Sequence, residues 1–458
     1  MNAIILSAIW GVVMMFSGVF LSSGEAIRKL AITGLLVLLA GNIAGLYDCR
    51  LFNVNTHGML AFSNFSLLFN TIVFAATLVY FLLSSKDIIK AGAHPAEYFT
   101  LIFFVLCGVS IASSYNTLLM LFIGIEIISI PLYILTGSNK HNLKSNEAAL
   151  KYFLMGAFST GIMLMGIALI YGARGTFSIA AMGTALQPGF TSMLVAGFAL
   201  LIISMSFKVS AAPFHFWTPD VYDGAPTVFT SFMATIVKAA VFIAFLRLFD
   251  GIYGAMPVKG KLIMAVITAA TLFVGNITAV FQQSVKRMLA YSSIAQAGFM
   301  LFALFSHNDM SEEGLLLYTA AYCLATIGIF AILIKMKDYT FEGFNGMGKH
   351  HPLLAGVTTV FLLSLAGIPL TAGFTAKFYM LASAIKTGSY LWLVIFAVLC
   401  AAVSVYYYFR VIQAMYFKEG ERQELEVSGS FKLWLVLIAA LIILIGVYPQ
   451  LIFYKLYF

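Results

Sequence analysis

Four ionisable side chains lie in the middle of long apolar segments, where charge is costly for a membrane protein. Three of them are lysines, Lys208, Lys238 and Lys377, and each is far from the segment ends at which an ammonium group could reach water. The fourth is Glu126, the only one of the chain's 18 acidic residues placed deep inside a hydrophobic stretch. Because intramembrane charge usually serves transport, one acid and three amines predict a proton path.

The composition identifies the elements that must position these residues. Hydrophobic residues make up 62% of the chain, charged residues only 10%, and the mean hydropathy is +0.98. Apolar stretches of membrane-spanning length recur from end to end, without the alternation typical of an outer-membrane barrel. Bilayer hydrocarbon offers backbone groups no partner, so the spans must be helices. The expected fold class is therefore an all-α polytopic membrane protein.

We expect about fourteen transmembrane helices in a single membrane domain over residues 1–458, because no loop is long enough to fold separately. The expected spans are 2–22, 31–48, 62–84, 98–114, 116–136, 147–171, 190–212, 225–246, 262–282, 288–306, 314–336, 353–384, 389–411 and 433–455.

The net charge of +8 is best explained by the placement of basic residues in the loops. One set of alternate loops carries fifteen lysines and arginines and the other only seven, a difference that places the richer set in the cytoplasm. Both termini are then expected on the outer, periplasmic side. No leading basic region precedes the apolar run after Met1, so this run is expected to be a retained span. Nucleic acid is not an expected partner.

Two spans are interrupted close to buried lysines. Pro213 and Pro219 follow Lys208, and Pro369 and Gly373 precede Lys377. Paired broken helices in two halves of a chain are typical of inverted-repeat transporters with an ion site near mid-membrane. We therefore expect two inverted five-helix repeats, approximately 98–246 and 262–411, with the remaining helices peripheral.

The sequence contains none of the motifs that are typical of redox or hydrolytic enzymes. The four cysteines are scattered singly, so neither a disulfide framework nor a zinc or iron–sulfur site is expected. There is no glycine-rich nucleotide loop after a strand, no nucleophile elbow and no HExxH motif. The sequence thus predicts no cofactor and no metal in the chain itself.

Several polar or aromatic residues also have ordinary structural interpretations. Asp220 and Asp223 suit a turn or a helix cap, and Lys286 with Arg287 suits a cytoplasmic anchor. The Tyr406-Tyr407-Tyr408 run and Trp392 are typical of an interfacial aromatic belt. His215 either bridges water at the broken helix or satisfies a local hydrogen bond.

At these motifs the chain resembles the antiporter-like subunits of respiratory complex I (NADH-quinone oxidoreductase), and most closely the N-type subunits, over nearly its whole length. The motifs that carry the resemblance are FKVSAAPFHFWTPDVYDGAP (207–226), ATIVKAAVF (234–242), FIGIEIISIPLYIL (122–135), NEAALKYFLMGAFSTG (146–161), QQSVKRMLAYSSIAQAGF (282–299) and AGFTAKFYML (372–381).

The resemblance implies a role for each buried charge. Glu126 and Lys208 look like the glutamate–lysine pair of the fifth and seventh helices, and Lys238 like the central relay lysine. Lys377 looks like the lysine of the broken twelfth helix, toward the outward exit. Glu147 and Lys151 match a second pair near the cytoplasmic end of the sixth helix, and His215 joins this second tier.

One position departs from the family pattern. Relatives often carry histidine in the SSxxH stretch, whereas this chain has Gln296 after Tyr291-Ser292-Ser293-Ile294-Ala295. Glutamine does not titrate, so a relay through this point needs water or another residue.

Two features bear on the type of subunit within the family. Lys377 favours the N-type or L-type subunit over the M-type. The ending at Phe458 disfavours the L-type subunit, which carries a long lateral helix.

What the resemblance implies is a subunit of a proton-pumping translocase in the bacterial inner membrane, with no redox chemistry of its own. Electrons would pass from NADH to quinone, as part of the electron transport chain, in other membrane and peripheral subunits. These subunits would carry FMN and iron–sulfur clusters. Membrane lipid is a further expected partner. Two alternatives are a subunit of a multisubunit sodium/proton antiporter and a membrane scaffold with vestigial charges.

Overall fold

The structure is a computed structural model, and it describes residues 1–92, 94–179, 181, 192–252, 258–388, 390–420, 425 and 427–457. Within these ranges the regular elements are helices, and the only β-type pairings are three isolated bridges. The all-α prediction is confirmed. Long helices are what apolar segments must form where lipid cannot pair with backbone groups.

Eleven helices of the described residues are long and apolar enough to cross a membrane, which makes this a multi-pass membrane protein. The expected count of fourteen stays a prediction, because the segments expected at 190–212, 288–306 and 353–384 are built from helices of at most 17 residues. The first residues of spans 190–212 and 389–411 lie outside the described ranges.

The long helices are α1 (Asn2–Phe20), α2 (Gly24–Leu46), α3 (Asn64–Lys90), α4 (Pro95–Ser114), α5 (Leu118–Thr136), α6 (Leu143–Arg174), α12 (Val258–Val280), α15 (Asp309–Leu333), α19 (Leu391–Phe417) and α20 (Gly429–Val447), together with the continuous segment Thr227–Asp250.

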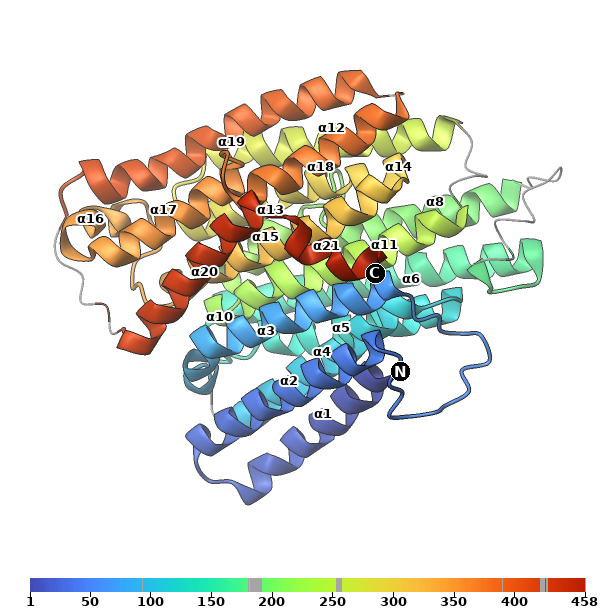
Figure 1. Ribbon diagram of the computed structural model, residues 1–458, viewed down its shortest axis with the longest axis horizontal. Coiled ribbons are helices and arrows are strands. Elements are labelled where there is room, and N and C mark those ends of the chain that lie inside the picture. The colour runs from blue at the N-terminus through green and yellow to red at the C-terminus, as the bar shows by residue number, and fades with distance from the viewer. Residues whose placement is uncertain are drawn as a thin grey trace.

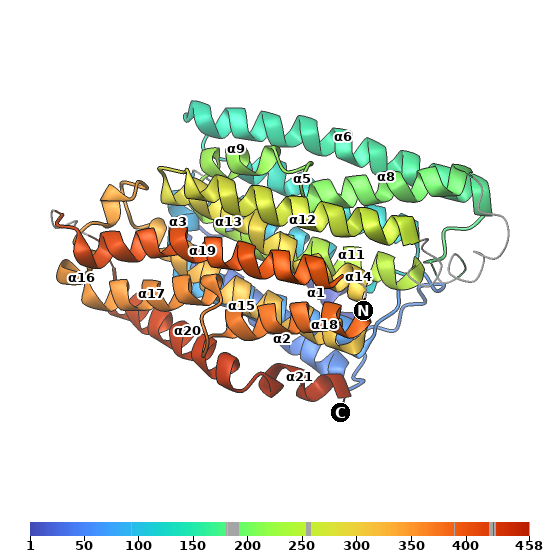
Figure 2. The ribbon, with the colours of Figure 1, turned by 90° about the horizontal axis from the view of Figure 1, so that it is seen from above.

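The helices lie side by side, and the two chain termini are found toward the same end of the bundle (Figures 1 and 2). The segment Thr227–Asp250 and helix α15 form the core, since 94% of the most apolar stretch of each is buried. For α1 that share is only 28%, and α1 packs mainly on α2 and α4 at the periphery. The central helices thus carry Lys238 away from lipid.

The first expected interruption is present directly after Lys208. Helix α8 (Ser192–Lys208) ends at this lysine, and the chain turns before α9 (Trp217–Gly224) begins. Pro213 lies in the turn, as the sequence predicts. Pro219 instead falls in the first turn of α9, where its missing N–H costs no intrahelical hydrogen bond.

The second expected interruption is also confirmed. Helix α17 (Pro352–Ala366) ends at Gly367, which has a φ of +83° that suits glycine, and α18 (Ala372–Thr387) begins after Pro369. Lys377 lies in the second turn of α18. The break therefore leaves the last carbonyl groups of α17 without intrahelical partners.

A third irregularity was not expected from the sequence. Helix α10 (Thr227–Phe232) passes into a π-helical turn, η1 (Met233–Val237), and then into α11 (Lys238–Ile252). Single π-helical turns often occur at functional sites. Here the turn ends directly at Lys238. The inverted-repeat relation between 98–246 and 262–411 stays a prediction, although each half contains one broken helix.

Two further sets of elements complete the chain. Helices α13 (Val285–Met300) and α14 (Phe302–Ser306) follow α12, and α13 contacts α12, α18 and α19. Short turns at η3 (Glu342–Phe344) and α16 (Met347–His350) connect α15 with α17, and α21 (Gln450–Tyr457) follows α20. Helix α13 thereby reaches both the core and the second broken helix.

Candidate functional site

Glu126 and Lys208 are each bonded to a hydroxyl group and not to each other. Thr160 Oγ1 donates to Glu126 Oε1 at 2.7 Å, while Lys208 Nζ donates to Ser129 Oγ at 2.9 Å and to the Tyr133 hydroxyl at 3.5 Å. Glu126, Ser129 and Tyr133 are spaced at i, i+3 and i+7, so they share one face of α5. The carboxylate is close enough to act electrostatically on Lys208, but no ion pair within 4.0 Å joins them in the described ranges.

Lys238 is almost completely buried, with 2% of its surface exposed. Its Nζ donates to the carbonyl oxygen of Ser293 at 3.0 Å and to Ser293 Oγ at 2.9 Å, and it lies 5.9 Å from the centre of the Tyr222 ring. Among the residues described, no carboxylate lies within ion-pair distance of this amine. A hydroxyl, a carbonyl and an aromatic face therefore replace a counter-ion.

Lys377 is bonded to the carbonyl groups that the second helix break leaves free. Its Nζ donates to the oxygen atoms of Leu365 at 2.8 Å and of Ala366 at 2.9 Å, and it lies 4.8 Å from the centre of the Phe299 ring. The φ of +83° at Gly367 suits glycine, and a Cβ there would also lie 2.9 Å from Lys377 Cδ and so disturb the lysine side chain. The break thus builds the acceptor site of this lysine.

Gln296 links the surroundings of the two core lysines. It lies one turn after Ser293 on α13, and its Nε2 donates to Leu365 O at 2.9 Å, the carbonyl oxygen that also accepts from Lys377. Its Nε2 also donates to the Tyr408 hydroxyl at 3.1 Å, and its Oε1 accepts from the Tyr318 hydroxyl.

The interfacial interpretation of the tyrosine run is wrong for two of its members. Tyr407 and Tyr408 are fully buried, and their hydroxyls bond Asn276 and Ser292, respectively. Only Tyr406 is exposed, at 58%. Consecutive residues of a helix point in different directions, so one run can face both lipid and core.

The second-tier residues Glu147 and Lys151 form an ion pair at the end of the bundle that also carries the basic loops. Lys151 Nζ lies 2.8 Å from Glu147 Oε1 and 3.0 Å from Asp220 Oδ2, and Arg287 lies 3.0 Å from the other Asp220 oxygen. Burial raises the pKa of the Asp220 carboxyl, but the hydrogen bonds from Lys151 and Arg287 outweigh it and hold this pKa below its usual range. Asp220 is therefore the centre of a charge network and not merely a turn former.

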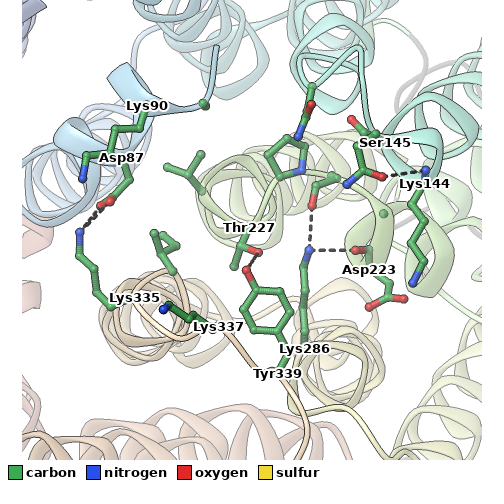
Figure 3. Close-up of a pocket in the computed structure, with 18 residues that line it drawn as sticks. Asp87, Lys90, Lys144, Ser145, Asp223, Thr227, Lys286, Lys335, Lys337 and Tyr339 are labelled. Carbon is green, nitrogen blue, oxygen red and sulfur yellow. Dashed lines mark hydrogen bonds and ion pairs between the residues drawn. The ribbon is translucent and has the colours of Figure 1, made fainter. Parts of the chain in front are cut away.

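A polar pocket of about 720 Å³ opens at the same end, between helices α3, α6, α10, α13 and α15 (Figure 3). Lys335 is paired with Asp87 at its wall, and the Thr227 hydroxyl donates to the Tyr339 hydroxyl at 3.1 Å. Lys286, expected to be a cytoplasmic anchor, lines this pocket as a buried residue: it is 3% exposed and donates to the carbonyl oxygens of Asp223 and Ala225. The pocket lining includes Thr227 and Val228, the first residues of the segment that continues to Lys238.

His215 lies in the turn between α8 and α9. It is buried next to Phe216, and its Nδ1 has no hydrogen-bond partner among the described residues. No hydrogen bond within that part of the chain ties it to Lys208, Lys238 or Lys377.

The broken helices and the row of buried amines define an antiporter-like membrane subunit. Residues 115–404 match the family described as NADH:quinone oxidoreductase/Mrp antiporter, TM, which covers more than half of the chain. The chain belongs to this family and, within it, to the NADH-quinone oxidoreductase subunit N proteins, which it matches over its full length.

Two subunit N relatives support that placement. The chain is 41% identical to NADH-quinone oxidoreductase subunit N of Cytophaga hutchinsonii over 99% of its own length and 98% of the relative. It is 42% identical to the subunit N of Trichlorobacter lovleyi over 85% of its own length and 82% of the relative.

Solved structures agree with the fold. A chain of respiratory complex I from Thermus thermophilus with bound aureothin has a TM-score of 0.85 and 31% identity, covering 98% of both chains. A chain of the archaeal membrane-bound sulfane sulfur reductase has a TM-score of 0.88 and 25% identity, covering 99% of this chain and 95% of the other. A chain of the Mrp complex from Dietzia sp. DQ12-45-1b has a TM-score of 0.84 at 18% identity, covering 99% of this chain and 95% of that one, and shows the fold alone.

Proposed function

We propose that this chain moves protons across the bacterial inner membrane as the subunit N of an NADH-quinone oxidoreductase. Oxidation of NADH and reduction of quinone would occur in other subunits, which would hold the FMN and the iron–sulfur clusters. The full-length likeness to curated subunit N proteins supports this assignment. In this proposal the chain contributes proton transfer and no redox step.

The observation that carries the proposal is the bonding of the buried amines. Lys208, Lys238 and Lys377 each donate to neutral oxygen atoms, and none of them forms an ion pair within 4.0 Å in the described part of the chain. An amine held by hydroxyl and carbonyl groups can lose its proton without leaving a carboxylate unpaired in the membrane interior. Such groups suit a relay better than a structural ion pair.

The coupling would begin at Glu126 and Lys208. A nearby carboxylate favours the protonated form of an amine, so a movement that changes the distance between the two changes the proton affinity of both. Parting the pair would release the Lys208 proton toward Lys238, and then toward Lys377 and the outer side. The helix break after Lys208 offers a point at which such a movement is possible.

The direction of transfer follows from the distribution of basic residues. By the positive-inside rule the loops richer in lysine and arginine would lie in the cytoplasm, and the Lys286 pocket would then lie at the uptake side. Both termini would then lie on the outer side, consistent with their position at a common end of the bundle (Figure 2). The ion pairs of Lys151 and Asp220 would lie at the cytoplasmic surface.

The test is a comparison of single alanine variants in the intact complex. We expect Lys238→Ala and Lys377→Ala to lower the number of protons translocated per NADH oxidised in proteoliposomes, while the exposed-loop control Lys140→Ala keeps the wild-type ratio. Each purified variant complex must show the absorbance of flavin and of iron–sulfur clusters. A normal ratio in both core variants would count against the relay.

The purified assembly also tests the alternative. Copurification with small hydrophobic subunits and no redox centres would move the assignment to a cation/proton antiporter.

A further inference from the structure

We propose that the polar pocket between helices α3, α6, α10, α13 and α15 is a binding site for a phosphate-bearing anion. The inference goes beyond the proposed proton transfer and does not depend on the direction of that transfer. Neither the sequence motifs nor the row of core lysines assigns a ligand to this pocket. Its basis is the charge, the hydrogen-bond donors and the size of the pocket.

The wall of the pocket carries more positive than negative charge. Five lysines and two aspartates line it, which leaves a surplus of three positive charges. The Asp87 carboxylate accepts hydrogen bonds from Lys335 through both of its oxygens, and the Asp223 carboxylate lies 3.9 Å from Arg287. The lining lysines that form no ion pair within 4.0 Å in the described part of the chain are Lys90, Lys144, Lys286 and Lys337.

Lys286 is the one of these lysines that is almost completely removed from water. Its Nζ donates to the carbonyl oxygens of Asp223 and Ala225, and the centre of the Tyr339 ring lies 5.5 Å away. An ammonium group has three N–H bonds, so one of them finds no acceptor among the described residues. The Asp223 carboxylate attracts Lys286, whereas Lys144 repels it. Because a buried charge is costly without a partner ion, an anion in the pocket would stabilise this residue.

Neutral groups add further hydrogen-bond donors to the pocket wall. The Tyr339 hydroxyl accepts a hydrogen bond from Thr227, which leaves its own O–H available to a ligand. The side-chain oxygen of Asn142 caps α6 by accepting from the backbone N–H of Lys144, so the amide group keeps its two N–H donors. A phosphate group offers several acceptor oxygens and up to two negative charges, and lysine is a common phosphate-binding residue.

The size of the pocket fits a phosphorylated small molecule. Its volume of about 720 Å³ lies within the roughly 300–1,000 Å³ of small-molecule sites. Lys144 and Lys337 lie on opposite sides of Lys286 in the view of Figure 3. A bare phosphate ion would fill only part of this space, so a phosphate ester with a body of its own is the expected class of ligand.

The position of the pocket favours a ligand from the aqueous phase over a lipid head group. Helices surround the pocket in Figure 3, and two of its neighbours, α15 and the segment Thr227–Asp250, form the core of the bundle. The pocket therefore opens at the end of the bundle and away from its lipid-facing flanks. A lipid head group would have to reach this place while its acyl chains stay in the bilayer.

The test uses an affinity probe on the intact complex in nanodiscs of phosphatidylcholine, a lipid without net charge. Pyridoxal 5′-phosphate carries an aldehyde that condenses with a nearby lysine amine and releases water, and borohydride then reduces the imine to a stable secondary amine. Pyridoxal, which lacks the phosphate, is the matched probe. Peptide mass spectrometry should find at least one of Lys90, Lys144 and Lys337 labelled several-fold more than Lys86, which is exposed on α3 outside the pocket. Pyridoxal should not show this preference.

Competition and one substitution identify the phosphate as the recognised group. Inorganic pyrophosphate should abolish the preference, whereas sodium chloride of the same ionic strength should not. Lys337→Gln removes a positive charge without breaking an ion pair of the described chain, so the complex should assemble. Labelling of the remaining pocket lysines by pyridoxal 5′-phosphate should fall several-fold in this variant. Lys349→Gln, at an exposed lysine outside the pocket, should leave that labelling unchanged.

The outcomes separate the source of the phosphate from the existence of the site. Competition by pyrophosphate in phosphatidylcholine supports a soluble ligand. Loss of the preference only when phosphatidylglycerol is added to the nanodiscs keeps the phosphate site and assigns it to a lipid head group. Equal labelling of the pocket lysines and Lys86, or the same preference with pyridoxal, would overturn the inference. None of these results changes the number of protons translocated per NADH, so the relay of lysines stands or falls separately.

Discussion

Glu126, Lys208, Lys238 and Lys377 are each held by neutral hydrogen-bonding groups, an arrangement that permits a change of protonation. Removing one partner of a buried ion pair leaves an uncompensated charge and costs about 3–5 kcal/mol. Hydroxyl and carbonyl partners avoid that penalty, because they carry no net charge and the neutral amine still has N–H bonds to donate to them. Thr160 and Ser129 provide the hydrogen bonds that Glu126 and Lys208 do not form with each other.

Thr160 is the residue at which this argument can be checked. The change Thr160→Val keeps the shape of the side chain and removes the hydrogen bond to Glu126, which, as a bond to a charged group, is worth about 1.5–3 kcal/mol. Glu126 is then free to move toward Lys208, and we expect NADH-driven proton translocation to slow several-fold. Ser159→Ala is the control, because the neighbouring Ser159 bonds Ser204 and not the carboxylate. Equal rates in the two variants would contradict the role of Thr160.

At the level of elements, the second helix break depends on a close approach that only glycine allows. A Cβ at Gly373 would lie 1.8 Å from the carbonyl oxygen of Ser364, a backbone atom that cannot swing aside. We expect Gly373→Ala to displace the start of α18, to destabilise the chain by at least about 1–3 kcal/mol and to lower the apparent melting temperature of the purified complex. Gly356→Ala is the control, since nothing lies within 4 Å of its added Cβ on α17. An unchanged melting temperature for Gly373→Ala would contradict this account of the break.

The breaks themselves could be predicted from the sequence, because proline and glycine next to a buried lysine have a direct backbone meaning. The π-helical turn before Lys238 could not, since Met233–Val237 is a plain apolar run and its irregularity depends on the surrounding helices. The same limit explains the buried Tyr408 and Lys286. A tyrosine in an apolar helix faces lipid or a partner helix according to the packing, and one sequence does not contain that packing.

For the whole molecule, the arrangement separates two polar ends across an apolar bundle. The pocket with Lys286 and Lys335 opens at one end, whereas Asn2 Nδ2 donates to the carbonyl oxygen of Cys49 near the other, where the termini lie. Large apolar side chains such as Phe20 and Phe158 remain exposed along the flanks, as lipid or neighbouring subunits require. Under the proposed function, proton transfer between the ends would pass through the buried polar groups of the core.

Native Cys49 allows the orientation of the molecule to be measured. It is exposed, whereas Cys107, Cys323 and Cys400 are buried, so a membrane-impermeant maleimide should label Cys49 alone among the four. Because the loop with Cys49 is expected outside, labelling should occur in right-side-out vesicles and not in inverted ones. In a Cys49→Ser background, Lys337→Cys in the pocket wall should show the opposite pattern. The reverse result in both cases would place the basic pocket outside, and uptake at Lys286 would then have the wrong direction for a pump driven from the cytoplasm.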